Sequence, residues 1–223
     1  MAARPSGRRR FLGEIGGLLA AAGMPSAHGT QLAASSACVL TPSATEGPFY
    51  LDDALVRSDI RDSRPGQPLR LRISVVDVDR GCAPAAGALV SIWHCDATGG
   101  YSGEAGSGDR TRFLRGVQPT NADGIAEFLT IYPGWYQPRT VHIHYKVLLG
   151  RTDALTSQLY FDDALNREVL GSHPAYRPNG LPRRTNLQDS IAGDRPSLIA
   201  VSREPDELEG RFVVGIARNG GSG

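Results

Sequence analysis

Short runs of alternating apolar and polar residues, each closed by a turn, dominate this chain and constrain its fold more than any other feature. The clearest run places Leu69, Leu71, Ile73 and Val75 on one parity and loses the alternation at 76–78, where we expect the strand to bulge or end. Further strands are predicted between turns rich in Gly, Pro, Asn and Asp, at 88–95, 113–117, 125–131, 140–149, 157–161, 197–203 and 211–216.

Helical signals are weak by comparison. One short helix is predicted at 163–170, and no segment carries the sustained periodicity of a long amphipathic helix. The sequence therefore predicts an all-β fold, a β-sandwich core of mixed or antiparallel strands with long active-site loops and little helix.

The composition fits one globular domain. The 223 residues are 40% hydrophobic and 21% charged, which is enough to bury one sizeable core. The first 29 residues hold four arginines and one glutamate, so 20 basic and 22 acidic residues remain beyond them. This balance gives no reason to expect a nucleic-acid or other polyanionic partner.

The N-terminal segment has the pattern of an export signal. A basic start at Arg8-Arg9-Arg10-Phe11-Leu12 precedes a short, mildly apolar run and small residues near 25–29. The Arg-Arg-x-Phe-Leu order resembles a twin-arginine signal. We expect a signal peptide at 1–29, a linker at 30–44 and the functional domain at 45–223, exported without a membrane anchor in the mature form. The alternative is a disordered, Arg-rich start.

Three cysteines, Cys38, Cys82 and Cys95, permit at most one internal disulfide, and their spacing does not form a zinc pattern. Cys95 lies in a strand-like run and is interpreted as a buried small side chain or a disulfide partner rather than a nucleophile. The sequence leaves the pairing open, and we do not predict lipidation at Cys38.

A His-x-His pair marks the segment 134–147. Val141, Ile143 and Tyr145 share one parity and face the core, whereas His142 and His144 stand side by side on the other face. Two imidazoles so placed can bind one ion of iron, copper or zinc. The alternative is a pair of half-exposed strand histidines with no ligand role.

Two tyrosines lie in turns next to predicted strands. Tyr101 sits in Gly99-Gly100-Tyr101-Ser102-Gly103, and Tyr136 in the turn before the histidine strand. Loops at strand ends are where a β-scaffold places functional side chains. Taken alone, these tyrosines are more typical of aromatic residues that pack against a turn.

Several separated motifs together carry a family resemblance. They are Thr45-Glu46-Gly47-Pro48-Phe49-Tyr50, Arg57-Ser58-Asp59-Ile60, Ile92-Trp93-His94-Cys95-Asp96-Ala97 followed by Tyr101-Ser102-Gly103, Phe113-Leu114-Arg115-Gly116-Val117-Gln118, Thr130-Ile131-Tyr132-Pro133-Gly134-Trp135-Tyr136, Arg139-x-x-His142-x-His144, and Ser157-Gln158-Leu159-Tyr160-Phe161. In this order, over about 41–190, they resemble the intradiol ring-cleavage dioxygenases, which include catechol and protocatechuate dioxygenases.

The resemblance implies iron(III), Fe(3+), held by Tyr101, Tyr136, His142 and His144. It also implies a small aromatic diol and O2 as substrates, with the ring of the catechol opened to a muconate-type diacid. A free phenol has a pKa near ~10, so a strongly Lewis-acidic ion is needed to keep two of them ionised at neutral pH. Hard anionic oxygen donors favour iron(III) over iron(II).

The same resemblance assigns catalytic roles to Tyr136, Arg139 and Gln158. Tyr136 would be both an axial ligand and a base that takes a substrate proton, and Arg139 would stabilise negative charge that develops on the ring. Strict strand parity puts Arg139 on the face opposite His142, unless Pro138 ends the regular strand. His94 shares the parity of the core and is excluded as a ligand; we expect it to donate to a backbone carbonyl.

Two alternatives remain open at this point. One is a secreted, non-catalytic β-sandwich binding module whose metal site has decayed, and the other is a copper or zinc site on the same histidines. His28 and His173 lie outside the motifs. The sequence leaves open which catechol is the substrate and what the oligomeric state is.

Overall fold

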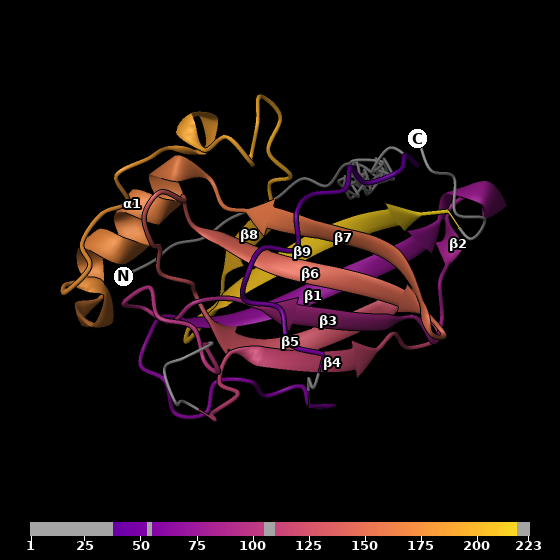
Figure 1. Ribbon diagram of the computed structural model, residues 1–223, viewed down its shortest axis with the longest axis horizontal. Coiled ribbons are helices and arrows are strands. Elements are labelled where there is room, and N and C mark those ends of the chain that lie inside the picture. Colours follow the sequence, from indigo (N-terminus) through magenta and orange to yellow (C-terminus); the bar gives the residue numbers. More distant parts are fainter. Residues whose placement is uncertain (1–37, 53–54, 105–109, 218–223) are drawn as a thin grey trace, which may run out of the picture. The chain divides into compact units, whose positions relative to one another are not determined.

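The computed structural model describes residues 38–52, 55–104 and 110–217. Within these ranges the chain forms nine strands and one α-helix (Figure 1). The strands are β1 (Pro68–Asp77), β2 (Ala83–Pro84), β3 (Leu89–Trp93), β4 (Arg115–Pro119), β5 (Ile125–Ile131), β6 (His142–Leu149), β7 (Thr152–Tyr160), β8 (Ala200–Arg203) and β9 (Leu208–Ile216). The helix is α1 (Asp163–Ser172), and 3-10 turns lie at Val78–Arg80, Pro174–Tyr176 and Asn186–Gln188.

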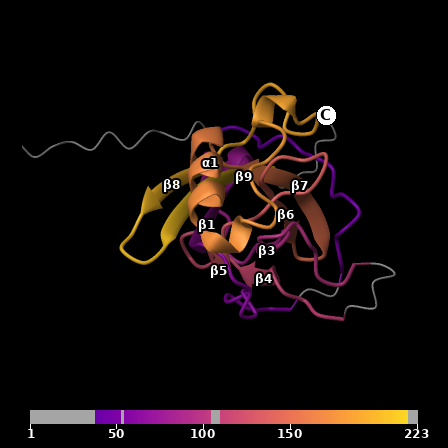
Figure 2. The same ribbon diagram turned by 90° about the vertical axis from the view of Figure 1, so that its left-hand side faces the viewer.

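The strands form two sheets, as Figures 1 and 2 show. In the first sheet, β1 pairs with β5 and β2 along one edge and with β9 along the other, and β8 follows β9. The β1–β9 pairing is parallel, so this sheet is mixed. The second sheet, in the order β4-β3-β6-β7, is antiparallel throughout. The predicted β-sandwich of mixed and antiparallel strands with little helix is confirmed.

Strand β1 is central to the first sheet, and its sequence explains why. Leu69, Leu71, Ile73 and Val75 are buried, while the residues between them are only half-buried, which is the alternation read from the sequence. The strand ends at Asp77, where a 3-10 turn closes on Gly81 in the left-handed conformation. Of the two outcomes expected at 76–78, a bulge or an end, the structure shows the end.

The second sheet has one face toward the core and one face toward the candidate site. Ile92, Ile143 and Leu159 belong to the hydrophobic core. On the opposite parity, Trp93 pairs with His144 across β3 and β6, and His144 pairs with Gln158 across β6 and β7. Because residues directly opposite one another in neighbouring strands point to the same face, these three side chains lie in one row.

This second face is covered by the segment 38–52, which we call the N-terminal strap. Cys38 is bound to Cys82 by a disulfide, and Cys95 is free and buried, so the pairing that the sequence left open is settled. The backbone N–H of Thr41 donates to Gly215 in β9 (2.9 Å), and that of Ala44 donates to Thr156 in β7 (2.9 Å). Residues 38–44, predicted as the end of a linker, are thus hydrogen-bonded to both sheets.

The only α-helix in the described ranges is too short to cross a membrane, and none of the described helices has the length and apolarity for it. Helix α1 begins at Asp162, whose carboxylate accepts from the backbone N–H groups of Ala164 and Leu165. The helix predicted at 163–170 is confirmed.

Candidate metal centre

The two histidines of β6 point to the strap-covered face and converge. Their Nε2 atoms lie 3.1 Å apart, and both rings are buried. His142 and His144 are two residues apart on one strand, so both side chains leave the same face. The predicted side-by-side pair is confirmed, and the alternative of half-exposed strand histidines is not.

Two loops bring Tyr101 and Tyr136 to the same place. The backbone N–H of Gly134 donates to the carbonyl of Asp96 (3.2 Å), and a Cβ at Gly134 would lie 2.4 Å from that same oxygen. A Cβ at Gly99, which has a φ of +91°, would lie 2.4 Å from the carbonyl of Trp135. Glycine is needed at both positions because the two backbones touch. As a result the rings of Tyr101 and Tyr136 lie 5.6 Å apart, edge to face.

The polar atoms of these side chains have the spacing of ligands to one ion. The hydroxyl of Tyr136 lies 3.4 Å from His142 Nε2, which in turn lies 3.1 Å from His144 Nε2. Two donor atoms that are each about 2.1 Å from a metal, at angles between tetrahedral and right-angled, are separated by roughly 3.0–3.4 Å. The hydroxyl of Tyr101 is buried and makes no hydrogen bond of ordinary geometry. These four residues therefore fit a mononuclear metal site.

The tautomer of His142 suits a ligand. Its Nδ1 lies 2.7 Å from the backbone carbonyl of Thr140, so Nδ1 carries the proton and Nε2 presents its lone pair to the centre. A ring N–H donated to a backbone carbonyl is the usual support for a metal-binding histidine. His144 differs, because its buried Nδ1 has no hydrogen-bond partner and its ring is instead stacked on Trp93.

Burial sets the protonation of the site. Loss of hydration, helped by the charge of Arg139, lowers the pKa of His142 to about 3, and burial with the nearby His142 holds the pKa of His144 well below its usual range. Both imidazoles are therefore neutral at pH 7. Burial also raises the pKa of Tyr101 and of Tyr136, so forming two phenolates here requires a compensating cation.

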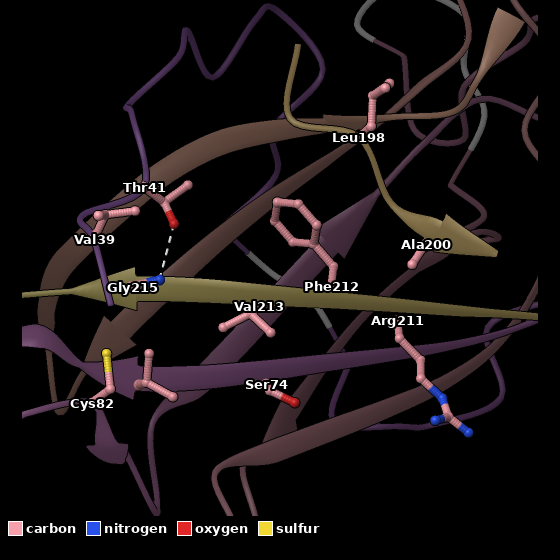
Figure 3. A pocket seen from close by; sticks show the side chains of 11 residues that line it. Val39, Thr41, Ser74, Cys82, Leu198, Ala200, Arg211, Phe212, Val213 and Gly215 are labelled. Atoms are coloured by element: carbon pink, nitrogen blue, oxygen red, sulfur yellow. Dashed lines mark hydrogen bonds between the residues drawn. The ribbon is translucent and has the colours of Figure 1, made fainter. Parts of the chain in front are cut away.

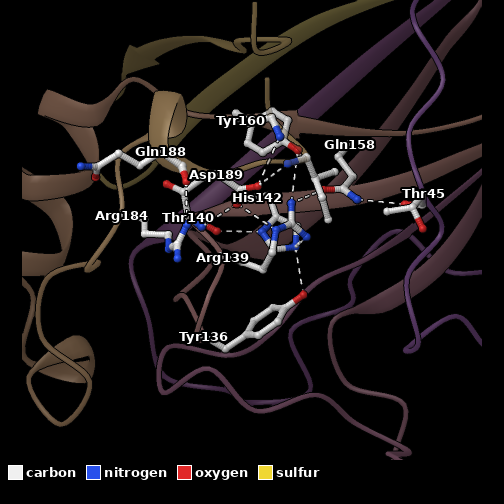
Figure 4. A network of polar contacts seen from close by, with 12 residues as sticks. Thr45, Tyr136, Arg139, Thr140, His142, Gln158, Tyr160, Arg184, Gln188 and Asp189 are labelled. Atoms are coloured by element: carbon white, nitrogen blue, oxygen red, sulfur yellow. Dashed lines mark hydrogen bonds and ion pairs between the residues drawn. The ribbon is translucent and has the colours of Figure 1, made fainter. Parts of the chain in front are cut away.

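Arg139 lies in the turn before β6, where its backbone N–H donates to the carbonyl of Tyr136 (2.7 Å). Since β6 begins at His142, strand parity does not govern position 139. The guanidinium lies on the side of the histidines, with Nη1 3.3 Å from His142 Nε2 (Figure 4). The parity conflict noted in the sequence is thereby resolved in favour of an irregular backbone around Pro138.

Gln158 links Arg139 to the N-terminal strap. Its Oε1 accepts from Arg139 Nη2 (2.5 Å) and from the hydroxyl of Tyr160 (2.9 Å), and its Nε2 donates to the carbonyl of Thr45 (2.9 Å). Figure 4 shows this buried chain of contacts beside His142. The structure therefore places all six predicted site residues together, four as converging donors and two as their polar neighbours.

Sequence analysis did not identify two residues that contact the site, Asp189 and Phe49. Asp189, which lies far along the chain, forms a 2.8 Å ion pair with Arg139, and no local motif pointed to it. Phe49 of the strap stacks on Tyr101 at 4.2 Å. His94 makes the expected contact with a backbone carbonyl: its Nδ1 lies 2.8 Å from the carbonyl of Cys95, and its Nε2 lies 2.7 Å from the hydroxyl of Thr130.

An apolar hollow lies away from this cluster. It is a groove of about 500 Å³ on the other sheet (Figure 3), with Val39, Phe212 and Val213 among its lining residues. None of the six predicted site residues lines it. In the described ranges no group of three or more His, Cys, Asp or Glu side chains is suited to a metal. The tyrosine and histidine cluster is the candidate centre because of the spacing of its donor atoms.

Fold and site together define a β-sandwich protein with a buried cluster of two tyrosines and two histidines on one face of its antiparallel sheet. A sequence model of the family described as Dioxygenase matches residues 42–172. An intradiol ring-cleavage dioxygenase from Tetranychus urticae has the same fold, with a TM-score of 0.75, 32% identity, and coverage of 82% of this chain and 96% of that one. The chain belongs to the intradiol ring-cleavage dioxygenase family.

Curated relatives are also named as dioxygenases of this kind, but their chains are longer than this one. Catechol 1,2-dioxygenase 1 of Acinetobacter lwoffii is 32% identical over 142 residues, which are 53% of this chain and 45% of the relative. Chlorocatechol 1,2-dioxygenase of Rhodococcus opacus is 28% identical over 147 residues, 55% of this chain and 56% of the relative. The chain thus spans about half the length of these relatives.

Proposed function

We propose that this protein is an iron(III)-dependent intradiol dioxygenase that uses O2 to open the ring of a catechol-type diol, giving a muconate-type diacid. The observation that carries the proposal is the convergence of Tyr136, His142 and His144, with donor atoms 3.1–3.4 Å apart and the buried Tyr101 hydroxyl beside them. The names of the relatives support the reaction class.

The donor set favours iron(III) over copper or zinc. Two phenolates supply hard, anionic oxygen and two imidazoles supply nitrogen, a combination unusual for either of the other metals. Bound there, iron(III) would draw electron density from a chelated catechol and make its ring reactive toward O2. The buried surroundings keep the imidazoles neutral, which leaves their lone pairs available as ligands.

Tyr136 is the donor best placed to exchange with substrate. Of the four side chains it alone is only partly buried, whereas Tyr101, His142 and His144 are enclosed. A phenolate released at Tyr136 Oη can accept a proton from a substrate hydroxyl, so one residue serves first as ligand and then as base. Arg139, whose positive charge lowers the pKa of Tyr136 against the effect of burial, favours the ionised form.

Arg139 supplies fixed positive charge next to the donor atoms. Its guanidinium is nearly enclosed, and its Nη1 faces the histidines. A cation held in a water-poor site acts on negative charge that develops on the ring more strongly than it would in water. Gln158 holds Nη2 from the other side, so its role is to orient the guanidinium.

The deciding experiment is O2 uptake by iron-loaded protein across catechol, protocatechuate and hydroxyquinol, with products identified by mass. An intradiol enzyme gives a diacid that contains both atoms of labelled O2, and iron analysis gives one ion per chain. A non-catalytic binding module would consume no O2 with any diol, and a copper or zinc protein would be identified by the metal analysis.

We also propose that the protein is exported by the twin-arginine route, with a signal peptide at 1–29. The Arg8-Arg9-x-Phe11-Leu12 order supports the route, and the Cys38–Cys82 disulfide supports an oxidising destination. Residues 1–29 lie outside the described ranges, so the proposal rests on their sequence. Cell fractionation with an activity assay tests it.

A further inference from the structure

Asp189 lies in the loop after the 3-10 turn Asn186–Gln188, fifty positions from the arginine that it contacts. We propose that Asp189 is a positioning residue for the ring-cleavage reaction: it holds the guanidinium of Arg139 so that Nη1 faces the metal donors. The inference rests on the proposed function for its kinetic consequence, whereas the positioning itself can be measured without any substrate.

The carboxylate of Asp189 is itself held by four hydrogen bonds. Its Oδ2 accepts from Arg139 Nε (2.8 Å) and from the backbone N–H of Thr140 (2.9 Å), while Oδ1 accepts from the backbone N–H groups of Ile191 (2.9 Å) and Ala192 (3.3 Å). Burial opposes the charge, but these hydrogen bonds and Arg139 together keep the pKa of Asp189 below its usual value. A charged, four-fold hydrogen-bonded carboxylate with 1% exposure is a rigid anchor.

Two of the three guanidinium nitrogens of Arg139 are occupied away from the metal donors. Nε is held by Asp189, and Nη2 donates to Gln158 Oε1 (2.5 Å) and to the hydroxyl of Tyr160 (3.3 Å). The remaining nitrogen, Nη1, lies 3.3 Å from His142 Nε2. Because the guanidinium is planar, anchors at Nε and Nη2 fix where Nη1 points.

The same carboxylate also steadies the histidine ligand. Asp189 accepts from the N–H of Thr140, and the carbonyl of Thr140 faces His142 Nδ1 at 2.7 Å. One side chain thus connects the loop at 186–192 both to Arg139 and to the residue that orients His142. Misplacement of a catalytic group by about 1 Å can cost on the order of 100-fold in rate, so an anchor of this kind has a kinetic effect without touching substrate.

The first test compares Asp189→Asn, Arg139→Gln and the double variant in iron-loaded protein. We expect Asp189→Asn to lower kcat on the order of 10- to 100-fold with little change in KM, and with iron content and visible absorption retained. In the Arg139→Gln background the same substitution should have a much smaller effect on kcat, limited to what the contact of Asp189 with Thr140 contributes. An equal fold-loss in both backgrounds, or a loss of iron in proportion to activity, would overturn the proposal.

Asp162→Ala is the stability control. The carboxylate of Asp162 caps α1 and does not contact Arg139, so its removal lowers stability without reaching the site. We expect the kcat of this variant to stay at the wild-type value when it is assayed below its melting temperature. If Asp162→Ala lowers kcat as much as Asp189→Asn does, the effect is one of general stability and the proposal fails.

The second test needs no activity. In protein loaded with gallium(III), a diamagnetic ion of the same charge as iron(III), the Arg139 Nε–H should give a slowly exchanging nitrogen-15 NMR signal, assigned by its absence from Arg139→Lys. Asp189→Asn should shift this signal and speed its exchange at least tenfold. An unchanged signal overturns the positioning role. An unreactive protein that still shows the shift would overturn only the proposed dioxygenase function.

Discussion

The rings of Trp93 and His144 lie parallel, with centroids 5.1 Å apart and an interplanar angle of 10°. The two residues face each other across β3 and β6. On another side of the imidazole lies Gly47, where an added Cβ would come within 3.2 Å of the ring carbon Cε1. Packing between an indole and a glycine therefore orients His144, in place of the hydrogen bond that orients His142.

Trp93→Leu is expected to weaken metal binding by about 10- to 100-fold, the range seen when support for a ligand is removed. It will also cost roughly 2–4 kcal/mol of stability, because a fully buried aromatic ring is lost. Chelator competition on the purified protein measures the first effect, and thermal unfolding measures the second.

Phe128→Leu separates these two effects. Phe128 is fully buried in the core between the sheets and lies in none of the contacts of the metal donors. The Phe128→Leu variant should lose stability while keeping the wild-type metal affinity. Trp93→Phe keeps a flat ring, so its metal affinity should lie between those of the wild type and Trp93→Leu. Equal metal affinity in Trp93→Leu and Phe128→Leu would show that stacking does not orient the ligand.

The two tyrosines should respond differently to removal of their hydroxyls. Iron-loaded protein is expected to be red to burgundy, because charge transfer from tyrosinate to iron(III) absorbs visible light. Tyr136→Phe should shift the colour and cut turnover, since it removes the group proposed as exchangeable donor and base. Tyr101→Phe should retain less iron, because it removes an enclosed donor. Colourless protein with one iron per chain would contradict both assignments.

His94 should make the protein sensitive to acid. Burial lowers the pKa of His94 to about 4 in the folded chain, against about 6.5 in an unfolded one. The unfolded chain therefore binds a proton that the folded chain excludes, and stability falls as the pH drops from about 6.5 toward 4. At pH 5 this contribution is a loss of about 2 kcal/mol relative to pH 8.

His94→Gln removes this titration but also the hydrogen bond to the carbonyl of Cys95. The variant should be less stable than the wild type at pH 8. At pH 5 the difference between their free energies of unfolding should be smaller by about 2 kcal/mol, because only the wild type loses stability through this histidine. Urea unfolding at both pH values measures it, and the other buried histidines cancel because they titrate in both proteins. A gap that is independent of pH would mean that His94 is not held neutral by the fold.

The outline of this site could be predicted because its donors lie in regular positions. His142 and His144 share a strand parity, and parity alone places them on the face away from Ile143 and the core. The strands were also predictable, since apolar and polar residues alternate along β1 up to Val75. The ends of the strands were harder to predict. The strand that carries the two histidines was predicted to begin at 140 but begins at His142, because the backbone around Pro138 is irregular.

What could not be predicted depends on contacts between distant segments. Asp189 reaches Arg139 only because the loop after α1 folds back over β6, and no spacing in the sequence encodes that. Phe49 is one of six residues in a motif that was noticed, but its stacking on Tyr101 depends on the path of the strap. Trp93 could have been found, because its parity places it on the face opposite Ile92.

Export should depend on the arginine pair. Replacing Arg8 and Arg9 by lysine is expected to strand iron-loaded, active enzyme in the cytoplasm, because the route carries folded proteins and a four-ligand site forms only on folding. The stranded protein should also have three free thiols, since the cytoplasm keeps cysteines reduced. Arg10→Lys, at the variable position of the motif, should be exported normally. Equal export of the wild type, the double variant and Arg10→Lys would rule out the twin-arginine route.

The parallel pairing of β1 with β9 sets the order in which the chain can fold. It joins Leu69 to Leu208 and Asp77 to Ile216. Strand β1 can pair with β2 and β5 earlier, but its other edge has no partner until residues 208–216 have been synthesised. Closure over so long a stretch of chain is slow, and an unpaired strand edge is prone to aggregate. The first sheet can therefore be completed only after translation has passed β9.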